Sequence, residues 1–254
     1  MNTLEFFSLV AMLVVAAASG LVGAFALMRR MTLAADAMSH VALPGLGAAM
    51  LIGINPLIGG AIALFLGAVL VWRLELKTKI ATETIVGVVF STSLAVGALL
   101  SPDHELLELL FGGETLFTWG EAIVGMVTGL VIIGLILSLK ERFAISFLSA
   151  DLAAVTGIRR EFLEFLFLMF FVITVLLGLN FLGVLLMGSL IIVPAATAKN
   201  VAKSFKGDLF ASALISSLSV LVGWLIANRF AFEIGPSIIA VAAVFFFVSL
   251  LFRD

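Results

Sequence analysis

Long apolar segments, separated by short polar ones, recur from one end of the chain to the other. Runs of about 17–25 apolar residues have the length of a helix that crosses a bilayer. Nine such runs can be placed, at about 5–28, 32–54, 56–73, 83–100, 119–139, 161–179, 181–198, 208–228 and 235–252. Tight turns are predicted at Asn55-Pro56 and at Asn180. The pattern predicts an all-α, polytopic membrane protein with about nine transmembrane helices.

The composition supports this prediction. Hydrophobic residues make up 63% of the 254 and charged residues 12%, whereas a soluble domain is about 45–50% apolar and about 25% charged. The chain has no cysteine, which excludes disulfides and thiolate metal sites. Its net charge of −2 says little on its own, and no nucleic-acid partner is expected. We expect one transmembrane domain over 1–254, beginning with a retained helix because no basic residue precedes its first apolar run.

The basic residues predict the orientation. If the N-terminus is outside, 13 of the 14 Lys and Arg residues fall in inner loops and only Arg229 falls outside. Cytoplasmic loops of membrane proteins carry such an excess of positive charge. The chain is therefore predicted to have its N-terminus outside and its C-terminus in the cytoplasm.

The predicted outer loop after the fourth span is acidic. Its first residues include Asp103, His104, Glu105 and Glu108, and the loop between Ser101 and Glu121 has no Lys or Arg. An acidic mouth attracts cations. The same residues also serve simply to keep an outer loop soluble, and the sequence leaves both interpretations open.

A short amphipathic helix is predicted at about 149–157, in the long inner loop after the fifth span. Ser149 can cap it and Gly157 can end it. Three apolar residues fall on one side of this helix: Leu148, Leu152 and Val155. Such a helix suits either docking onto a cytoplasmic partner or lying flat on lipid headgroups.

The second span contains the one acid and histidine that lie well inside a predicted span. Asp36, His40 and Pro44 are spaced four apart, so on a helix they share one face. Pro44 has no N–H and would free the carbonyl of His40. Ionisable groups inside a membrane are costly and commonly mark an ion path. A hydrogen bond between helices is the alternative role for His40.

Three further residues are candidates for the pathway or its gating. Glu83 begins the fourth span, while Ser189 and Pro194 lie in a seventh span rich in small residues. Small residues let membrane helices approach closely, so packing is the alternative role for the seventh span.

Motifs for catalysis are absent from the sequence. It has no phosphate-binding Gly-x-x-x-x-Gly-Lys-Ser/Thr loop, no His-Glu-x-x-His and no Gly-x-Ser-x-Gly. No enzymatic activity is expected. Energy for transport would come from another chain or from an ion gradient.

Four stretches together resemble one known family. They are Arg29 to Gly45 with Asp36-Ala37-Met38-Ser39-His40, Glu83 to Phe90, Leu110-Phe111-Gly112, and Gly183 to Ala198 with Gly235-Pro236-Ser237 further on. They resemble the membrane permease subunits of bacterial ABC importers for zinc, manganese and iron. Gly113-Glu114 departs from the family, which often has Asn or Asp after its Phe-Gly.

The resemblance implies a partner set and a role for several residues. It implies a homodimeric permease in the bacterial plasma membrane, with two cytoplasmic ATP-binding subunits and an extracytoplasmic metal-binding protein. The metal would pass along the dimer interface as cargo, with no permanently bound cofactor. Asp36 and His40 match residues that contact the metal in transit. The 149–157 helix is similar to the family's coupling helix, which implies an ATPase contact through Asp151, Leu152, Ala153 and Gly157.

Two other functions remain open from the residues alone. A proton-coupled secondary transporter would use Asp36 and His40 as a relay. A scaffold protein that transports nothing would tolerate loss of Asp36 but not changes around Asp151. The metal itself is undetermined, because carboxylate and imidazole suit zinc, manganese and iron alike.

Overall fold

The computed structural model describes residues 3–78, 80–100 and 118–252. These residues form ten α-helices and one short 3-10 helix, without any strand, which confirms the all-α prediction. The helices are α1 (Thr3–Met28), α2 (Thr32–His40), α3 (Leu43–Leu51), α4 (Pro56–Lys77), α5 (Thr82–Leu100), α7 (Trp119–Leu148), α8 (Ala150–Val155), α9 (Arg160–Val201), α10 (Phe205–Phe230) and α11 (Ile234–Ser249), followed by η1 (Leu250–Phe252).

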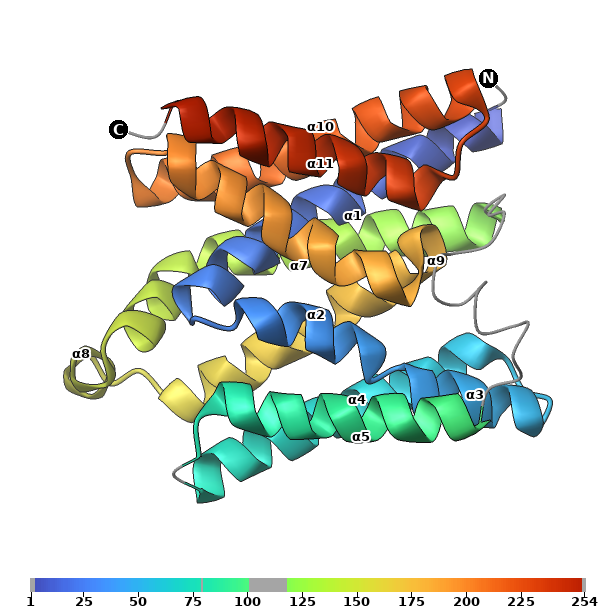
Figure 1. Cartoon of the computed structure of the whole chain (residues 1–254). Coiled ribbons are helices and arrows are strands. Elements are labelled where there is room, and N and C mark those ends of the chain that lie inside the picture. The colour runs from blue at the N-terminus through green and yellow to red at the C-terminus, as the bar shows by residue number, and fades with distance from the viewer. Residues whose placement is uncertain (1–2, 79, 101–117, 253–254) are drawn as a thin grey trace.

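Seven segments of the described residues are long and apolar enough to cross a membrane. They are Thr3–Met28, Pro56–Lys77, Thr82–Leu100, Trp119–Leu148, Arg160–Leu179, Phe205–Phe230 and Ile234–Phe252. The other two predicted spans correspond to α2 with α3 and to the later part of α9. The start of α1 and the end of α11 lie at opposite ends of the bundle. α8 projects at the end of the bundle where α11 ends (Figure 1). The count of nine and the orientation remain predictions.

The predicted second span is two short helices instead of one. α2 ends at His40 and α3 begins at Leu43. Between them the amides of Val41 and Ala42 donate to carbonyls only three residues back, at 3.1 and 3.3 Å. Pro44 lies in the first turn of α3, where a missing N–H is tolerated. The prediction of a continuous helix is therefore wrong, and Asp36 and His40 sit on α2 alone.

The predicted sixth and seventh spans belong to one bent helix. α9 runs without interruption from Arg160 to Val201, so the predicted end of a helix at Asn180 is wrong. In a straight helix Gly178 and Met187, nine residues apart, would be separated by about 13 Å. Here a side chain on Gly178 would overlap the Met187 sulfur, so α9 bends between the two residues. Figure 1 shows α9 accordingly as two arms that meet at an angle. Similarly, α7 continues to Leu148, nine residues past the predicted end of its span.

α1 forms the centre of the bundle and packs against α7, α9 and α10. Gly20 lies directly against the backbone of Ser212 on α10, and Gly23 against that of Ile191 on α9. Near its C-terminal end, Phe25 packs against several aromatic rings: Phe143, Phe147 and Phe205. The small and aromatic residues of α1 thus fix the helices around it. α2 follows after a turn of three residues.

A buried ionic cluster holds the end of α1 where this turn begins. Arg29 is only 8% exposed, and its Nη2 donates to both carboxylate oxygens of Glu75 on α4, at 2.9 and 2.8 Å. Glu164 on α9 lies 4.0 Å away and also accepts from Arg160, at 2.7 Å. The Arg29 guanidinium also lies 5.6 Å from the ring centre of Phe147 on α7. One side chain therefore ties α1 to α4, α7 and α9.

Replacing Arg29 by methionine should destabilise the protein. The substitution keeps most of the side-chain volume but leaves Glu75 and the buried Glu164 without this cation. Hydrogen bonds to charged groups contribute about 1.5–3 kcal/mol, so we expect a loss of stability of that size, measured as a lower melting temperature of the purified protein. Arg73→Met is the matched control, because Arg73 is exposed on α4. Equal melting temperatures for the two variants would contradict the structural role of Arg29.

Candidate metal-transport site

α2 carries the two candidate ligands and lies between α5 and α9. Asp36 is exposed in the isolated chain, whereas His40 is only 7% exposed. The His40 ring packs edge-on against Phe90 of α5, with ring centres 5.3 Å apart. Ser39 donates a 2.6 Å hydrogen bond to the backbone carbonyl of Asp36. The ligand pair is thus built on a short helix held on two sides.

The imidazole of His40 has a nitrogen without a partner. Nδ1 is buried and makes no hydrogen bond within the described part of the chain. Buried polar atoms in native proteins are nearly always paired, so an exception calls for an explanation. A neutral imidazole nitrogen is a common metal ligand. The structure therefore does not support the alternative in which this nitrogen forms a hydrogen bond between helices of one chain.

Asp36 is held in place by close packing against the second arm of α9. A Cβ atom on Gly188 would lie 2.5 Å from the Asp36 Cα and 2.8 Å from its Oδ1. No ion pair of the Asp36 carboxylate is found with any Lys or Arg among the described residues. The absence of a side chain at Gly188 therefore allows α2 to lie this close to α9.

Replacing Gly188 by alanine should displace α2. Overpacking of a tight contact costs about 1–3 kcal/mol, so we expect a lower melting temperature together with reduced transport. Gly134→Ala on α7 is the matched control, because a Cβ there meets nothing within 4 Å and alanine favours the helix. If Gly188→Ala matches Gly134→Ala in both melting temperature and transport, Gly188 does not position Asp36.

The other pathway candidates lie at different places. Ser189 follows Gly188 on the second arm of α9 and is half-buried, while Pro194 is buried further along the same arm. Pro44 is half-buried beyond the α2–α3 break. Glu83 is exposed in the first turn of α5, seven residues or about 10 Å along the helix from Phe90. The proposed pathway roles of Ser189, Pro194, Pro44 and Glu83 therefore stay predictions.

One copy of the described chain does not hold a complete metal site. No group of three or more Asp, Glu or His side chains converges among the described residues. Asp36 and His40 of one copy supply two ligands, and a four-coordinate site needs more. Any tighter coordination has to draw on groups from elsewhere.

The acidic mouth lies outside the described residues. This applies to Asp103, His104, Glu105 and Glu108, whose proposed role stays a prediction. Glu121, at the end of the same acidic segment, has a structural role. Its carboxylate accepts from the Thr118 amide at 2.9 Å, while the Thr118 hydroxyl accepts from the Glu121 amide at 3.3 Å. This capping box begins α7.

The predicted amphipathic helix is present as α8. The Ser149 hydroxyl accepts from the Leu152 amide at 3.2 Å, and Gly157, with φ of +70°, ends the helix. Ala153 is buried, while Asp151 is exposed and Leu152 and Val155 are 56% and 88% exposed. The apolar side of α8 is therefore exposed in the isolated chain, and the helix projects from the bundle (Figure 1).

Sequence reasoning missed the contacts that hold these residues. Gly188 stands among small residues of the seventh predicted span, but nothing in the sequence identifies Asp36 as its neighbour. Phe90 is one of 23 phenylalanines. Arg29 and Glu75 are 46 positions apart. Each of these contacts depends on how distant segments meet.

Residues 3–253 match the model of the ABC 3 transport family. The chain belongs to this family. Three curated relatives match over nearly the whole chain. The manganese transport system membrane protein MntC of Listeria monocytogenes is 25% identical, covering 96% of this chain and 89% of the relative. The zinc uptake membrane protein ZnuB of Haemophilus influenzae is 27% identical, covering 91% of each chain. The chelated iron transport membrane protein YfeD of Yersinia pestis is 27% identical, covering 97% and 84%.

A solved structure has the same fold. PsaBC from Streptococcus pneumoniae, in complex with a Fab, matches with a TM-score of 0.84 and 27% identity, covering 98% of this chain and 91% of that one. The family and the fold make this chain a multi-pass protein of the bacterial plasma membrane. It is a membrane subunit of an ABC-type transporter, a transport component and not an enzyme.

Proposed function

We propose that this chain is the permease of an ABC importer for a divalent transition metal, namely manganese, zinc or iron. The observation that carries the proposal is the buried Nδ1 of His40, which has no partner among the described residues and lies one helical turn from a carboxylate that is unpaired there. Imidazole and carboxylate bind these metals, and the named transport systems of the relatives carry the same three.

The permease works as a homodimer in this proposal. Asp36 is exposed in one copy, yet a carboxylate facing lipid inside a membrane is costly. A second copy related by two-fold symmetry would bring its own Asp36 and His40 to the same path. The four side chains then form a site that one chain lacks. Such a site is open enough to release the metal again.

Energy comes from two cytoplasmic ATP-binding subunits that dock on α8. The exposed Leu152 and Val155 support this, because an apolar, projecting helix face fits a groove on a partner. An extracytoplasmic metal-binding protein delivers the metal at the outer face. Membership of an ABC family favours this mechanism over proton-coupled transport through Asp36 and His40.

The ATPase activity of the assembled complex tests the proposed function. We expect hydrolysis to rise when the metal-loaded binding protein is added with one of Mn²⁺, Zn²⁺ or Fe²⁺, and uptake into vesicles to require ATP. Uptake driven by a pH gradient without ATP would support the secondary transporter instead. Hydrolysis and uptake that respond to none of the three metals would contradict the proposal.

A further inference from the structure

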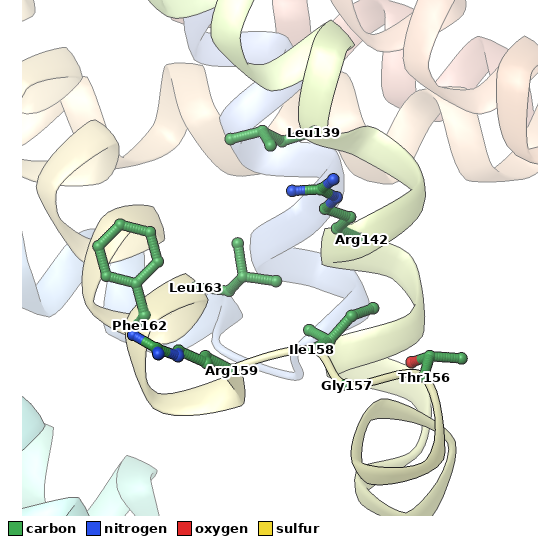
Figure 2. A pocket seen from close by; sticks show the side chains of 8 residues that line it. All are labelled: Leu139, Arg142, Thr156, Gly157, Ile158, Arg159, Phe162 and Leu163. Atoms are coloured by element: carbon green, nitrogen blue, oxygen red, sulfur yellow. The ribbon is translucent and has the colours of Figure 1, made fainter.

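A pocket opens where α7, the end of α8 and the start of α9 meet. Its volume is about 380 Å³. The pocket is lined by side chains from three segments (Figure 2): Leu139 and Arg142 from α7, Ile158 and Arg159 from the connection after α8, and Phe162 and Leu163 from α9. It lies beside the ion-pair cluster of Arg160 and Glu164 but shares none of its residues.

Two cations line this pocket and have no partner in the described part of the chain. Arg142 and Arg159 are exposed, and neither side chain forms an ion pair or hydrogen bond with a described residue. Glu141 and Glu161, their nearest acids along the chain, do not line the pocket. Figure 2 shows Arg142 on the α7 side of the pocket and Arg159 on the opposite side, where its side chain runs toward Phe162. Exposed guanidinium groups that line one pocket favour a phosphate, to which arginine donates paired hydrogen bonds.

The rest of the pocket is apolar and continues onto the surface of α7. Leu139 follows Val131 and Leu135 at a spacing of four, so the three share one helix face. Val131 and Leu135 are 52% and 42% exposed on a membrane-spanning helix. Phe162, on the opposite wall, is 59% exposed. An apolar strip thus leads along the helix to two arginines at its end.

We propose that this pocket binds an anionic phospholipid of the cytoplasmic leaflet. The phosphate lies between Arg142 and Arg159, and an acyl chain follows Leu139 toward Leu135. Basic pockets between helices at the cytoplasmic surface bind such headgroups. The inference rests on the predicted orientation, which places this end of α7 inside. An acidic protein segment would not fit as well, because the strip beyond the arginines is apolar and lies on the membrane-spanning part of α7.

The bound lipid would brace the base of α8. Both walls of the pocket continue into the segments that carry this helix: α7 ends at Leu148, and Thr156, Gly157 and Ile158 follow α8. Filling the pocket links α7 to the start of α9. Lipid composition would therefore affect how firmly the docking helix is held.

Binding of defined lipids to the full chain in neutral detergent tests the proposal. Native mass spectrometry would compare phosphatidylglycerol with phosphatidylcholine at equal concentration. We expect retention of phosphatidylglycerol in preference to phosphatidylcholine. Each basic group near a membrane surface contributes about 1 kcal/mol, so the Arg142→Gln/Arg159→Gln variant should bind phosphatidylglycerol roughly tenfold to thirtyfold more weakly. Arg73→Gln/Lys77→Gln, which removes two exposed basic residues of α4, should bind like the unaltered chain.

Two further measurements separate the lipid from other anions. Phe162→Ala should weaken phosphatidylglycerol binding while the chain remains folded, because Phe162 is an exposed wall of the pocket. Inorganic phosphate should displace the lipid poorly. The proposal is overturned if both double variants bind phosphatidylglycerol equally, if the two lipids bind alike, or if inorganic phosphate competes as well as the lipid does. None of these readouts depends on transport, so they are independent of the proposed function.

Discussion

Replacing Asp36 by asparagine, or His40 by glutamine, is expected to lower metal uptake by the assembled transporter at least tenfold. Both substitutions keep the approximate size of the side chain and remove the charge or the imidazole nitrogen. In a two-fold symmetric permease each substitution removes two ligands at once. Mutation of a group that only hydrogen-bonds to a metal ligand typically lowers metal affinity or activity about 10–100-fold. Loss of a ligand itself should have at least that effect. Uptake of radioactive metal into proteoliposomes measures the effect.

A control separates loss of a ligand from loss of a charge. Glu141→Gln removes an exposed acid of α7 and should transport like the unaltered protein. The variants should also assemble with the ATP-binding subunits, because α8 is untouched. If Asp36→Asn and His40→Gln both retain full uptake, neither side chain is part of the metal path.

Introducing aspartate at Leu152 and Val155 is expected to abolish docking of the ATP-binding subunit. The two side chains are exposed in the isolated chain, so the double variant should fold and keep its melting temperature. At a docked interface the new carboxylates would be buried without partners, which costs several kcal/mol. We expect affinity for the ATP-binding subunit to fall at least 100-fold, measured by co-purification and by binding to the immobilised permease.

Ala150→Asp provides the matched control on the same helix. Ala150 is exposed but lies on another side of α8 from Leu152 and Val155, and an acid in the first turn suits the helix dipole. This variant should dock normally. Equal docking by Ala150→Asp and the double variant would show that the apolar side of α8 is not the contact.

The regular parts of the fold could be predicted because local sequence determines them. Apolar runs located the long helices, and the turn predicted at Asn55-Pro56 is present, where the Asn55 side chain accepts from the Leu57 amide at 2.9 Å. Ser149 caps the start of α8, and Gly157, with its positive φ, ends it. These features depend on neighbours in the chain, which the sequence lists directly.

The irregular parts could not be predicted, because hydrophobicity does not distinguish a bent helix from two separate ones. The apolar run around His40 and Pro44 continues through the break between α2 and α3. The sequence around Asn180 suggests a turn, yet hydrogen bonding of α9 passes through it.

The candidate site divides in the same way. The spacing of Asp36 and His40 identified the pair, since four residues make one helical turn. Their surroundings came only from the structure: Phe90 beside the imidazole, Gly188 beside the carboxylate, and an unpartnered Nδ1. The predicted stripe through Pro44 was interrupted by the end of α2.

Cross-linking at position 36 tests the central claim most directly, namely that two copies bring Asp36 to one metal path. The chain has no cysteine, so Asp36→Cys introduces the single thiol of the protein. A short bifunctional thiol reagent should convert this variant, within the assembled transporter, into a covalent dimer. Glu141→Cys, at an exposed position outside the proposed path, should stay monomeric under the same conditions. If Asp36→Cys also stays monomeric while its thiol reacts with a monofunctional reagent, the two copies do not meet at Asp36 and the proposed path is wrong.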